Sequence, residues 1–234
     1  DDRPTTTKTR VMARHHHVVR FDRESEADVP DPVARELVAR IAALLEGADA
    51  LVLEDYNKGV LVPAVISAAL REARRRGCPS VADPKFRHFF DYAGVRVFKP
   101  NALELAAAFG LPAAPRDPET LAAARHRLRC EHLLLTLGEE GMILVGPDGQ
   151  SHRIPAVPRD VFDVSGAGDT VTATVAACLA AEATELEAAT VANLAASVEV
   201  GKAGVVPVAA DEIVEAHESE RLRRESLAWR EPGT

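Results

Sequence analysis

The stretch that decides the fold is DVFDVSGAGDTVTATVAACLAAE, residues 160–182. It opens on a glycine-containing turn between two aspartates and continues as an alanine-rich segment typical of a helix. Glycine lets the backbone approach a ligand closely, and the free N–H groups at the start of a helix favour anions. The stretch therefore predicts an anion site at residues 166–169, directly beside the carboxylate of Asp169.

Composition limits the class of protein. The chain has 234 residues, of which 47% are hydrophobic and 4% aromatic, which favours one α/β core built from Ala, Val and Leu. A net charge of −8 with no long basic block argues against nucleic-acid binding. We expect no membrane span, because every run of 18 residues contains a charge. Three scattered cysteines and a polar start, DDRPTTTKTR, favour a cytoplasmic protein.

Strands and helices are expected to alternate along the chain, which predicts a parallel sheet with helices on both faces. The expected strands are 10–24, 50–56, 79–84, 95–100 and 131–137, followed by a hairpin at 141–156 that turns at PDGQ. The expected helices are 31–47, with Asp31 as N-cap, 61–77, 101–110, capped by Asn101, 118–130, 167–182, 184–200 and about 210–228. We expect one domain over 1–234.

Polar residues follow four of the expected strands. In parallel sheets, ligands bind beyond the carboxyl ends of the strands. Ordinary turn chemistry explains any one such group, but it explains four together less well. The residues concerned are Glu54, Asp55 and Lys58, then Asp83 and Lys85, then Lys99 and Asn101, and finally Thr136 and Gly138.

Several common signatures are absent from the sequence. It contains no Walker A motif, no G-x-G-x-x-G fingerprint, no G-x-S-x-G elbow and no H-E-x-x-H zinc helix. His15, His16 and His17 form the one histidine run, but only His15 and His17 would share a strand face. With no partner ligand evident, we expect a solvated strand face there instead of a metal site.

Five segments, in this order, resemble the ribokinase (PfkB) family of sugar kinases: EDYNKGVL, VADPK, KPNALEL, TLGEEGM and DVSGAGDT. The set is most similar to the D-glycero-β-D-manno-heptose-7-phosphate kinases, the kinase half of bifunctional ADP-heptose synthases. The resemblance implies a three-layer α/β/α fold with a mostly parallel central sheet. It also implies the remnant of a small β lid at 8–24, a nucleotide-binding core at 31–210 and a C-terminal helix at 210–234. The family's N-terminal third and the nucleotidyltransferase half would be missing.

The resemblance assigns catalytic roles around the anion turn. Asp169 would be the general base that takes the proton of the sugar hydroxyl, and the N–H groups of Gly166, Ala167 and Gly168 would hold the γ-phosphate. Asn101 and Glu104 match the family's N-x-x-E, so that Glu104 would hold Mg²⁺ through water. The alternative for this pair is a helix cap plus a solvent-facing acid.

The remaining roles concern ATP and the sugar. The resemblance places Thr136, Gly138 and Gly141 around the phosphates and ribose of ATP, with Asn193 at the adenine and Lys85 at a phosphate. Lys58 and Asp55 would contact the sugar substrate. The alternatives stay open. In them, the two glycines are needed only to begin a hairpin, Asn193 is an exposed amide, and the two lysines lie at the surface.

The expected reaction is ATP-dependent phosphorylation of D-glycero-β-D-manno-heptose 7-phosphate to the 1,7-bisphosphate, a step toward the lipopolysaccharide core. The alternatives are a kinase of this fold for another sugar or nucleoside, a non-catalytic nucleotide-binding fragment, and a structural subunit. A homodimer through the lid strand and a monovalent cation near Asp163 and Gly204 are further expectations. The C-terminal helix is expected to dock through Leu222 and Trp229.

Overall fold

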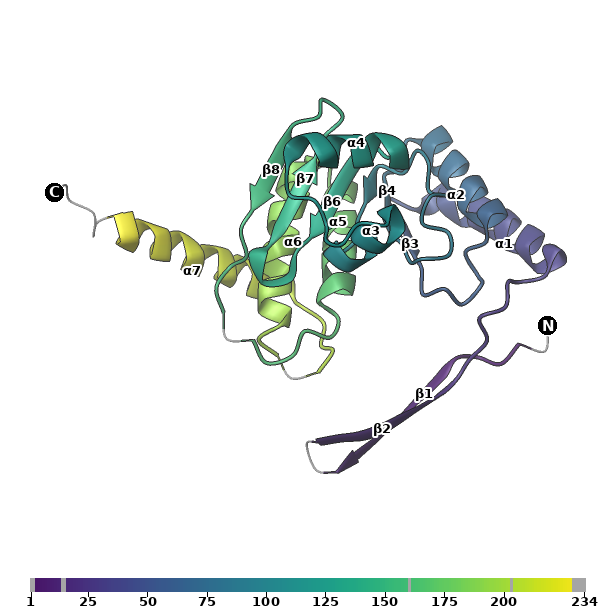
Figure 1. Cartoon of the computed structure of the whole chain (residues 1–234), viewed down its shortest axis with the longest axis horizontal. Coiled ribbons are helices and arrows are strands. Elements are labelled where there is room, and N and C mark those ends of the chain that lie inside the picture. Colours follow the sequence, from purple (N-terminus) through teal and green to yellow (C-terminus); the bar gives the residue numbers. More distant parts are fainter. Residues whose placement is uncertain (1–2, 14–15, 160, 203, 229–234) are drawn as a thin grey trace.

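A six-stranded sheet forms the centre of the computed structural model, which describes residues 3–13, 16–159, 161–202 and 204–228 (Figure 1). The strand order is β3-β4-β5-β6-β7-β8, and the pairs from β3 to β6 are parallel while β7 and β8 are antiparallel additions. The bounds are β3 Leu51–Glu54, β4 Ser80–Asp83, β5 Val97–Phe98, β6 His132–Thr136, β7 Met142–Val145 and β8 Ser151–Ile154. This confirms the predicted, mostly parallel sheet.

Helices cover both faces of the sheet, and alternating side chains of the strands divide the core between them. Leu133 and Leu135 of β6 pack in the cluster that α2, α3 and α4 complete, whereas Leu134 packs with α5 and α6 on the other face. The bounds are α1 Asp31–Leu44, α2 Pro63–Arg76, α3 Ala102–Phe109, α4 Pro118–Leu128, α5 Ala167–Ala180 and α6 Glu185–Glu199. α1 packs against α2 at the β3 end of the sheet (Figure 1). The predicted three layers are therefore present.

Local signals set most of the helix ends. α2 ends at Gly77, which adopts φ +71° and caps the helix as predicted. Asn101 caps α3, again as predicted, in a reciprocal capping box with Glu104. The prediction that Asp31 caps α1 was wrong, because Pro30 is the N-cap and the Asp31 side chain lies inside the first turn without capping it. Pro30 has a ψ of 151° and is still extended, so the helix begins at Asp31, one residue earlier than predicted.

The segment expected as one strand at 10–24 is a two-stranded antiparallel hairpin, β1 Thr7–Ala13 and β2 His16–Arg23. The single-strand prediction was wrong, because the reversal falls within ARHHH, a stretch without the Gly, Asn or Pro that usually marks a turn. Figure 1 shows the hairpin extending away from the central sheet, to which it is not hydrogen-bonded. His15 and the side chains of His16 and His17 lie outside what the structure describes, so the expectation of a solvated face there stays a prediction.

The last helix, α7 Ala210–Ala228, projects from the body on the side opposite α1 (Figure 1). Its first half packs on α6 through Ala216 and Ile213. The prediction that Leu222 docks the helix was wrong, since that residue is 58% exposed. At about 100° per residue, Leu222 lies about 240° around the helix from Ala216 and cannot share its face. Trp229 lies outside the described residues.

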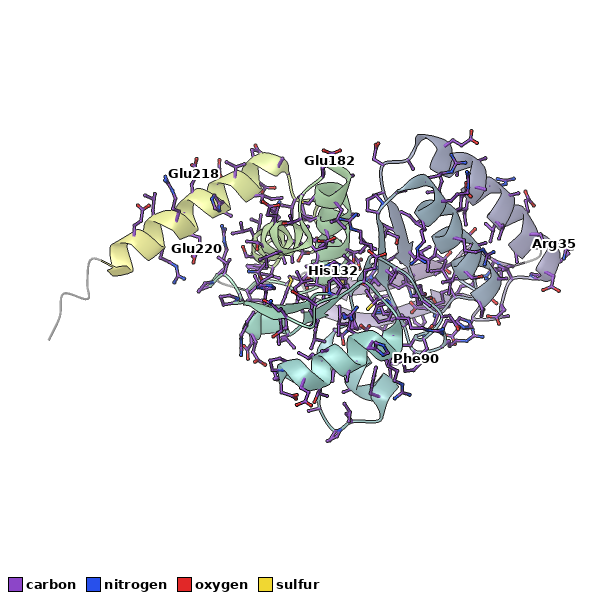
Figure 2. The ribbon with its side chains drawn as sticks, turned by 90° about the horizontal axis from the view of Figure 1, so that it is seen from above. Arg35, Phe90, His132, Glu182, Glu218 and Glu220 are labelled. Carbon is purple, nitrogen blue, oxygen red and sulfur yellow. The ribbon has the colours of Figure 1, made fainter. Side chains whose placement is uncertain are left out.

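The far half of α7 carries charged side chains. Figure 2 shows Glu218 and Glu220 on the part of α7 that extends beyond the other helices.

None of the helices in the described ranges is long and apolar enough to cross a membrane.

Gly141 offers a test of the close backbone packing between the start of β7 and the end of β8. Gly141 has φ +91°, and a Cβ there would overlap the carbonyl oxygen of Ile154. Gly110 has φ +64° with nothing within 4 Å of a Cβ. We expect Gly110→Ala to cost about 1–2 kcal/mol of unfolding free energy, which is the penalty of left-handed backbone alone. Gly141→Ala should cost more, because the backbone must also separate. Urea denaturation of both variants measures this, and equal losses would contradict the steric argument.

Candidate active site

Three carboxyl groups meet at the carboxyl edge of the sheet. One oxygen each from Glu54, Asp83 and Asp169 lies within 4.8 Å of the other two. Glu54 and Asp83 end the neighbouring parallel strands β3 and β4 and are paired in register, which brings their side chains to one edge. Asp169 comes from the first turn of α5, which packs against the same two strands. We call these three residues the acidic cluster.

A buried lysine offsets part of this negative charge. Lys99 Nζ lies 2.8 Å from Asp83 Oδ2, and the two side chains are 3% and 6% exposed. A buried ion pair of this kind is needed because an isolated buried charge costs several kcal/mol. The same Nζ would lie 3.8 Å from a Cβ built on Gly168, so the ammonium group is also close to the turn that begins α5. The sequence placed Lys99 among the strand-end residues but gave it no role.

The turn itself has the free donors that an anion site requires. Gly166 is the N-cap of α5 with φ +95°, and no side chain caps the helix. Among the residues that the structure describes, no hydrogen bond uses the amide N–H of Gly168 or Asp169, whereas the Ala167 amide, also predicted as a donor to the anion, donates to the Val164 carbonyl at 3.4 Å. A Cβ on Gly166 would lie 3.0 Å from Val205 and 3.1 Å from Glu199, a tight but adjustable fit, so the positive φ is the main reason for glycine there.

A tyrosine that the sequence reasoning missed contacts the candidate base. The Tyr56 hydroxyl donates a hydrogen bond of 2.9 Å to Asp169 Oδ2, across 113 residues of sequence. Burial, followed by the contact with Asp169, raises the pKa of Tyr56 above its ordinary value, so the phenol stays a neutral donor. The signal was present in the sequence, since Tyr56 follows Glu54 and Asp55 at the end of β3.

Crowding also changes the protonation of Glu54. Desolvation, then the charges of Asp83 and Asp169, raises the pKa of Glu54 to about 8. Glu54 therefore holds its proton over much of the neutral range. This lowers the net charge of the acidic cluster and leaves the Glu54 carboxyl able to donate a hydrogen bond.

A second group of predicted residues lies together one strand further along the sheet. The Asn101 side chain accepts from the Glu104 amide at 2.8 Å, and Glu104 Oε2 accepts from the Asn101 amide at 2.8 Å. Lys85 pairs with Glu104 Oε1, and the Glu104 side chain is 5% exposed. Glu104 is thus a buried acid with partners on both oxygens, unlike the solvent-facing acid of the alternative explanation.

The residues predicted to surround ATP adjoin this group. Thr136 forms an isolated parallel bridge with Asn101 at the end of β6. Gly138 and Gly141 follow in left-handed conformations, and the Leu137 amide donates to the Gly141 carbonyl. Asn193 is buried on α6 and donates to the Pro155 carbonyl at 2.9 Å, so the alternative that it is exposed was wrong.

The two residues predicted to contact sugar make other contacts in this structure. Asp55 is 4% exposed and accepts from the Tyr92 hydroxyl at 3.0 Å and from the Asn57 amide at 2.7 Å. Lys58 pairs with Glu24 and Glu26, which follow β2 at the base of the hairpin. Both residues flank Tyr56 in sequence, but within the described residues no hydrogen bond or ion pair joins either one to Asp169.

A buried acid lies behind the anion turn. Glu199, at the end of α6, is 1% exposed, and within the described chain neither of its carboxyl oxygens has a hydrogen-bond partner. The amides of Phe162 and Asp163 both donate to the carbonyl of Val200, which holds the 162–166 segment against this end of α6. Desolvation, then the charges of Asp163 and Asp169, raises the pKa of Glu199. Sequence reasoning missed Glu199 because it stands within an apolar helical pattern.

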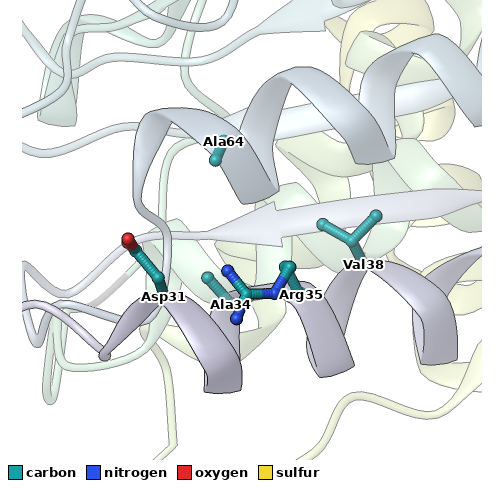
Figure 3. A pocket seen from close by; sticks show the side chains of 5 residues that line it. All are labelled: Asp31, Ala34, Arg35, Val38 and Ala64. Carbon is teal, nitrogen blue, oxygen red and sulfur yellow. The ribbon is translucent and has the colours of Figure 1, made fainter.

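A hollow of about 300 Å³ lies elsewhere, between α1 and α2 (Figure 3). Its lining side chains are Asp31, Ala34, Arg35, Val38 and Ala64. None of these belongs to the acidic cluster or to the Asn101 group, so the hollow is separate from the candidate active site.

The raised pKa of Glu54 predicts a pH dependence of stability. A carboxyl group that binds its proton more tightly when folded stabilises the fold below its ordinary pKa of 4.5, and this contribution is lost as the pH rises toward about 8. We expect the unfolding free energy of Glu54→Gln to fall less than that of the wild type between about pH 5 and about pH 8. Glu139→Gln, at an exposed turn, is the control and should keep the wild-type slope. Identical slopes for all three proteins would contradict the shift.

Comparison with known sequences identifies relatives over most of the chain. Residues 1–211 match the pfkB family carbohydrate kinases. The bifunctional protein HldE of Paramagnetospirillum magneticum is 45% identical over 228 residues, which cover 96% of this chain and 46% of that protein. The protein of the same name from Pelobacter propionicus is 45% identical, with coverages of 92% and 44%. The chain therefore spans about half the length of the curated relatives it matches.

Solved structures match the fold. Arabidopsis thaliana ribokinase complexed with ribose and ATP aligns with a TM-score of 0.69 at 18% identity, covering 92% of this chain and 70% of that one. Phosphofructokinase-2 from Escherichia coli in complex with potassium aligns with a TM-score of 0.75 at 18% identity, with coverages of 93% and 71%. These alignments confirm the ribokinase-like fold, and with the match over residues 1–211 they establish that the chain belongs to the pfkB family of carbohydrate kinases.

Proposed function

We propose that this chain transfers the γ-phosphoryl group of ATP to a hydroxyl of a sugar phosphate, D-glycero-β-D-manno-heptose 7-phosphate, giving the 1,7-bisphosphate. One observation carries the proposal. The carboxylate of Asp169 lies in the first turn of α5, where the amides of Gly168 and Asp169 have no hydrogen-bond partner in the described part of the chain. The family match supports the reaction class. The 45% identity to proteins named HldE, together with the five motifs similar to heptose-phosphate kinases, supports the choice of sugar.

In the proposed step the attacking sugar oxygen forms a bond to the γ-phosphorus while the bond from that phosphorus to the bridging oxygen of ADP breaks. The hydroxyl proton passes to the Asp169 carboxylate. The free amides of Gly168 and Asp169 stabilise the charge on the transferring group, and the buried ammonium of Lys99 adds positive charge beneath the same turn. A carboxylate is a sufficient base here, because the proton is lost as the new P–O bond forms.

Mg²⁺ would neutralise charge on the ATP phosphates when bound. Glu104 is the residue proposed to hold it through water, and a buried carboxylate supplies the hard oxygen ligand that Mg²⁺ prefers. Lys85, which pairs with Glu104 in this structure, is long enough to contact a phosphate instead. Asn101, Thr136, Gly138 and Gly141 adjoin this position, and on this proposal they surround the nucleotide.

The chain also has oxygen donors that fit a monovalent cation. Both Glu199 oxygens are buried without a partner in the described structure, and Asp163 and the Val200 carbonyl lie beside the same turn. A bound cation would supply the missing partner and would lower the repulsion between Glu199 and the two aspartates. The proposed position is directly behind Gly166, so the cation would support the anion turn from its far side.

We further propose that two copies associate through the hairpin. Val11 is paired with Val19, and Phe21 lies two residues further along, so these three side chains share one face of the hairpin. They are 42%, 38% and 61% exposed, which leaves an apolar face without cover. A second hairpin with the same face is its proposed partner.

Asp169→Asn tests the catalytic proposal. We expect turnover with the heptose 7-phosphate to fall by about 10²–10⁴-fold, the usual worth of a general base. ATP affinity should change little, because the amide side chain keeps the shape of the site. ADP formation and calorimetry with ATP–Mg²⁺ measure the two quantities. Asp148→Asn, in the exposed β7–β8 turn, is the matched control and should retain wild-type turnover.

Three outcomes would contradict parts of this proposal. Retained turnover in Asp169→Asn would remove that residue from its role. A panel of sugars and nucleosides in which another acceptor yields ADP, and the heptose does not, would assign a different substrate to the same site. ATP binding without transfer to any acceptor would support the non-catalytic alternative.

Phe21→Asp tests the hairpin interface. A carboxylate in the centre of the apolar face is expected to convert a dimer into a monomer, measured as molar mass by light scattering after gel filtration. Val18→Asp is a matched control, because Val18 is also 61% exposed but lies on the opposite face. Dissociation by both variants, or by neither, would contradict this interface.

A further inference from the structure

Tyr56 contacts the candidate base directly and is itself exposed to solvent. Its hydroxyl donates to Asp169 Oδ2 at 2.9 Å, and the side chain is half exposed. We propose that Tyr56 is a positioning residue that occupies the Asp169 carboxylate until the sugar arrives and thereby suppresses hydrolysis of ATP by water. This inference rests on the proposed function, because it assigns to Asp169 the role of base.

Hydrolysis is the side reaction that such a site must avoid. In it, the oxygen of water bonds to the γ-phosphorus, the bond to the bridging oxygen of ADP breaks, and a proton of the water passes to Asp169. The products are ADP and inorganic phosphate. Asp169 is exposed, so water reaches it when no sugar is present. Because Oδ2 accepts a hydrogen bond from Tyr56, one of its lone pairs is occupied and the carboxylate is held in one rotamer, which leaves fewer positions from which a water can pass its proton to Asp169.

The phenol suits this task because it is a donor and not a competing base. The acidic cluster beside it, with Asp169 in contact and Glu54 and Asp83 near, opposes loss of its proton. A sugar hydroxyl that replaces it makes the same kind of hydrogen bond to Asp169, so the exchange leaves the carboxylate satisfied. Water makes the same bond, but it lacks the other sugar contacts that would hold it in place of Tyr56.

The loop that carries Tyr56 has one end fixed to the core. Asp55 accepts from the Asn57 amide at 2.7 Å and from the Tyr92 hydroxyl at 3.0 Å, and both Asp55 and Tyr92 are buried. Asn57 then takes a left-handed conformation with φ +55°, which turns the chain away from the sheet. Tyr56 is therefore held between a fixed residue and a sharp turn.

The other end of the loop is tied to the segment that carries the hairpin. Lys58 Nζ lies 2.6 Å from Glu24 and 2.8 Å from Glu26. The Val29 amide donates to the Gly59 carbonyl at 2.8 Å, and a Cβ on Gly59 would overlap the Ala27 carbonyl oxygen. Residues 24–29 join β2 to α1. The position of the Tyr56 loop is thus coupled to residues 24–29, so that a displacement of this segment also displaces the Tyr56 hydroxyl from Asp169.

Tyr56→Phe tests the proposal, with Tyr92→Phe as its matched control. These are the two tyrosines of the chain, and each donates to a carboxylate, but only Tyr56 donates to Asp169. In the full-length protein we expect Tyr56→Phe to raise phosphate release from ATP without sugar by about tenfold, the rate equivalent of one hydrogen bond. Tyr92→Phe should lower the melting temperature, because it removes the donor to Oδ2 of the buried Asp55 carboxylate, but should not raise hydrolysis.

Lys58→Gln tests the link between the Tyr56 loop and residues 24–29. It removes the ion pairs with Glu24 and Glu26 and keeps nearly the length of the side chain. We expect a smaller rise in sugar-independent hydrolysis in the same direction, because the loop still carries Tyr56 but is no longer held. Wild-type hydrolysis in Lys58→Gln would overturn the coupling to the hairpin segment and leave the role of Tyr56 standing.

The outcomes separate this inference from the proposed function. If the wild type phosphorylates the sugar but Tyr56→Phe hydrolyses ATP no faster than the wild type, the role of Tyr56 is overturned and the kinase assignment survives. If no sugar is phosphorylated but Tyr56→Phe still accelerates hydrolysis, the role of Tyr56 stands and the acceptor is wrong. If the protein neither phosphorylates a sugar nor hydrolyses ATP in any variant, both are overturned.

Discussion

The buried ion pair between Lys99 and Asp83 is the interaction on which the site depends. Three carboxyl groups meet at the edge of the sheet, and Asp83 is almost fully buried among them. Without a cation at 2.8 Å, the buried charge of Asp83 would be unpaired, which costs several kcal/mol. The raised pKa of Glu54 keeps this carboxyl protonated, which reduces the repulsion among the three carboxyl groups. Asp169 can then stay at the exposed side of the cluster, where a base has to be.

Strand β5 connects the two halves of the site. It lies between β4 and β6, and within three residues of its end it supplies Lys99 to the acidic cluster and Asn101 to the group around Glu104. The parallel arrangement of β3 to β6 aligns all four carboxyl ends, so the acidic cluster and the group around Glu104 lie at one edge although their residues are far apart in sequence. The antiparallel β7 and β8 extend this edge with the start of β7 at Met142 and the end of β8 at Ile154, which lie in register with Thr136.

Most of the elements could be predicted from the sequence because their signals are local. The 3.6-residue pattern, the caps at Gly77 and Asn101 and the Asp-Gly turn each act within a few residues. The hairpin was missed because ARHHH carries no turn residue, and the docking of α7 was misjudged because its apolar residues do not share one face. In the site, Asp169, Asn101 and Glu104 could be identified from motifs. Tyr56 and Lys99 lie in two of these motifs, but their contacts could not be predicted because Asp169 and Asp83 are distant in sequence. Glu199 had no signal, because its burial depends on how α6 packs.

The sequence by itself therefore determined the alternation of strands and helices, the position of the anion turn and the identity of the acid beside it. These follow from short-range preferences of glycine, from helix capping and from hydrophobic periodicity. Only the tertiary structure decided that Tyr56 contacts Asp169, that Lys99 neutralises Asp83 and that Glu199 is buried behind Gly166. Such contacts depend on how α5 and α6 pack against the sheet, and long-range packing geometry is not encoded in any local pattern.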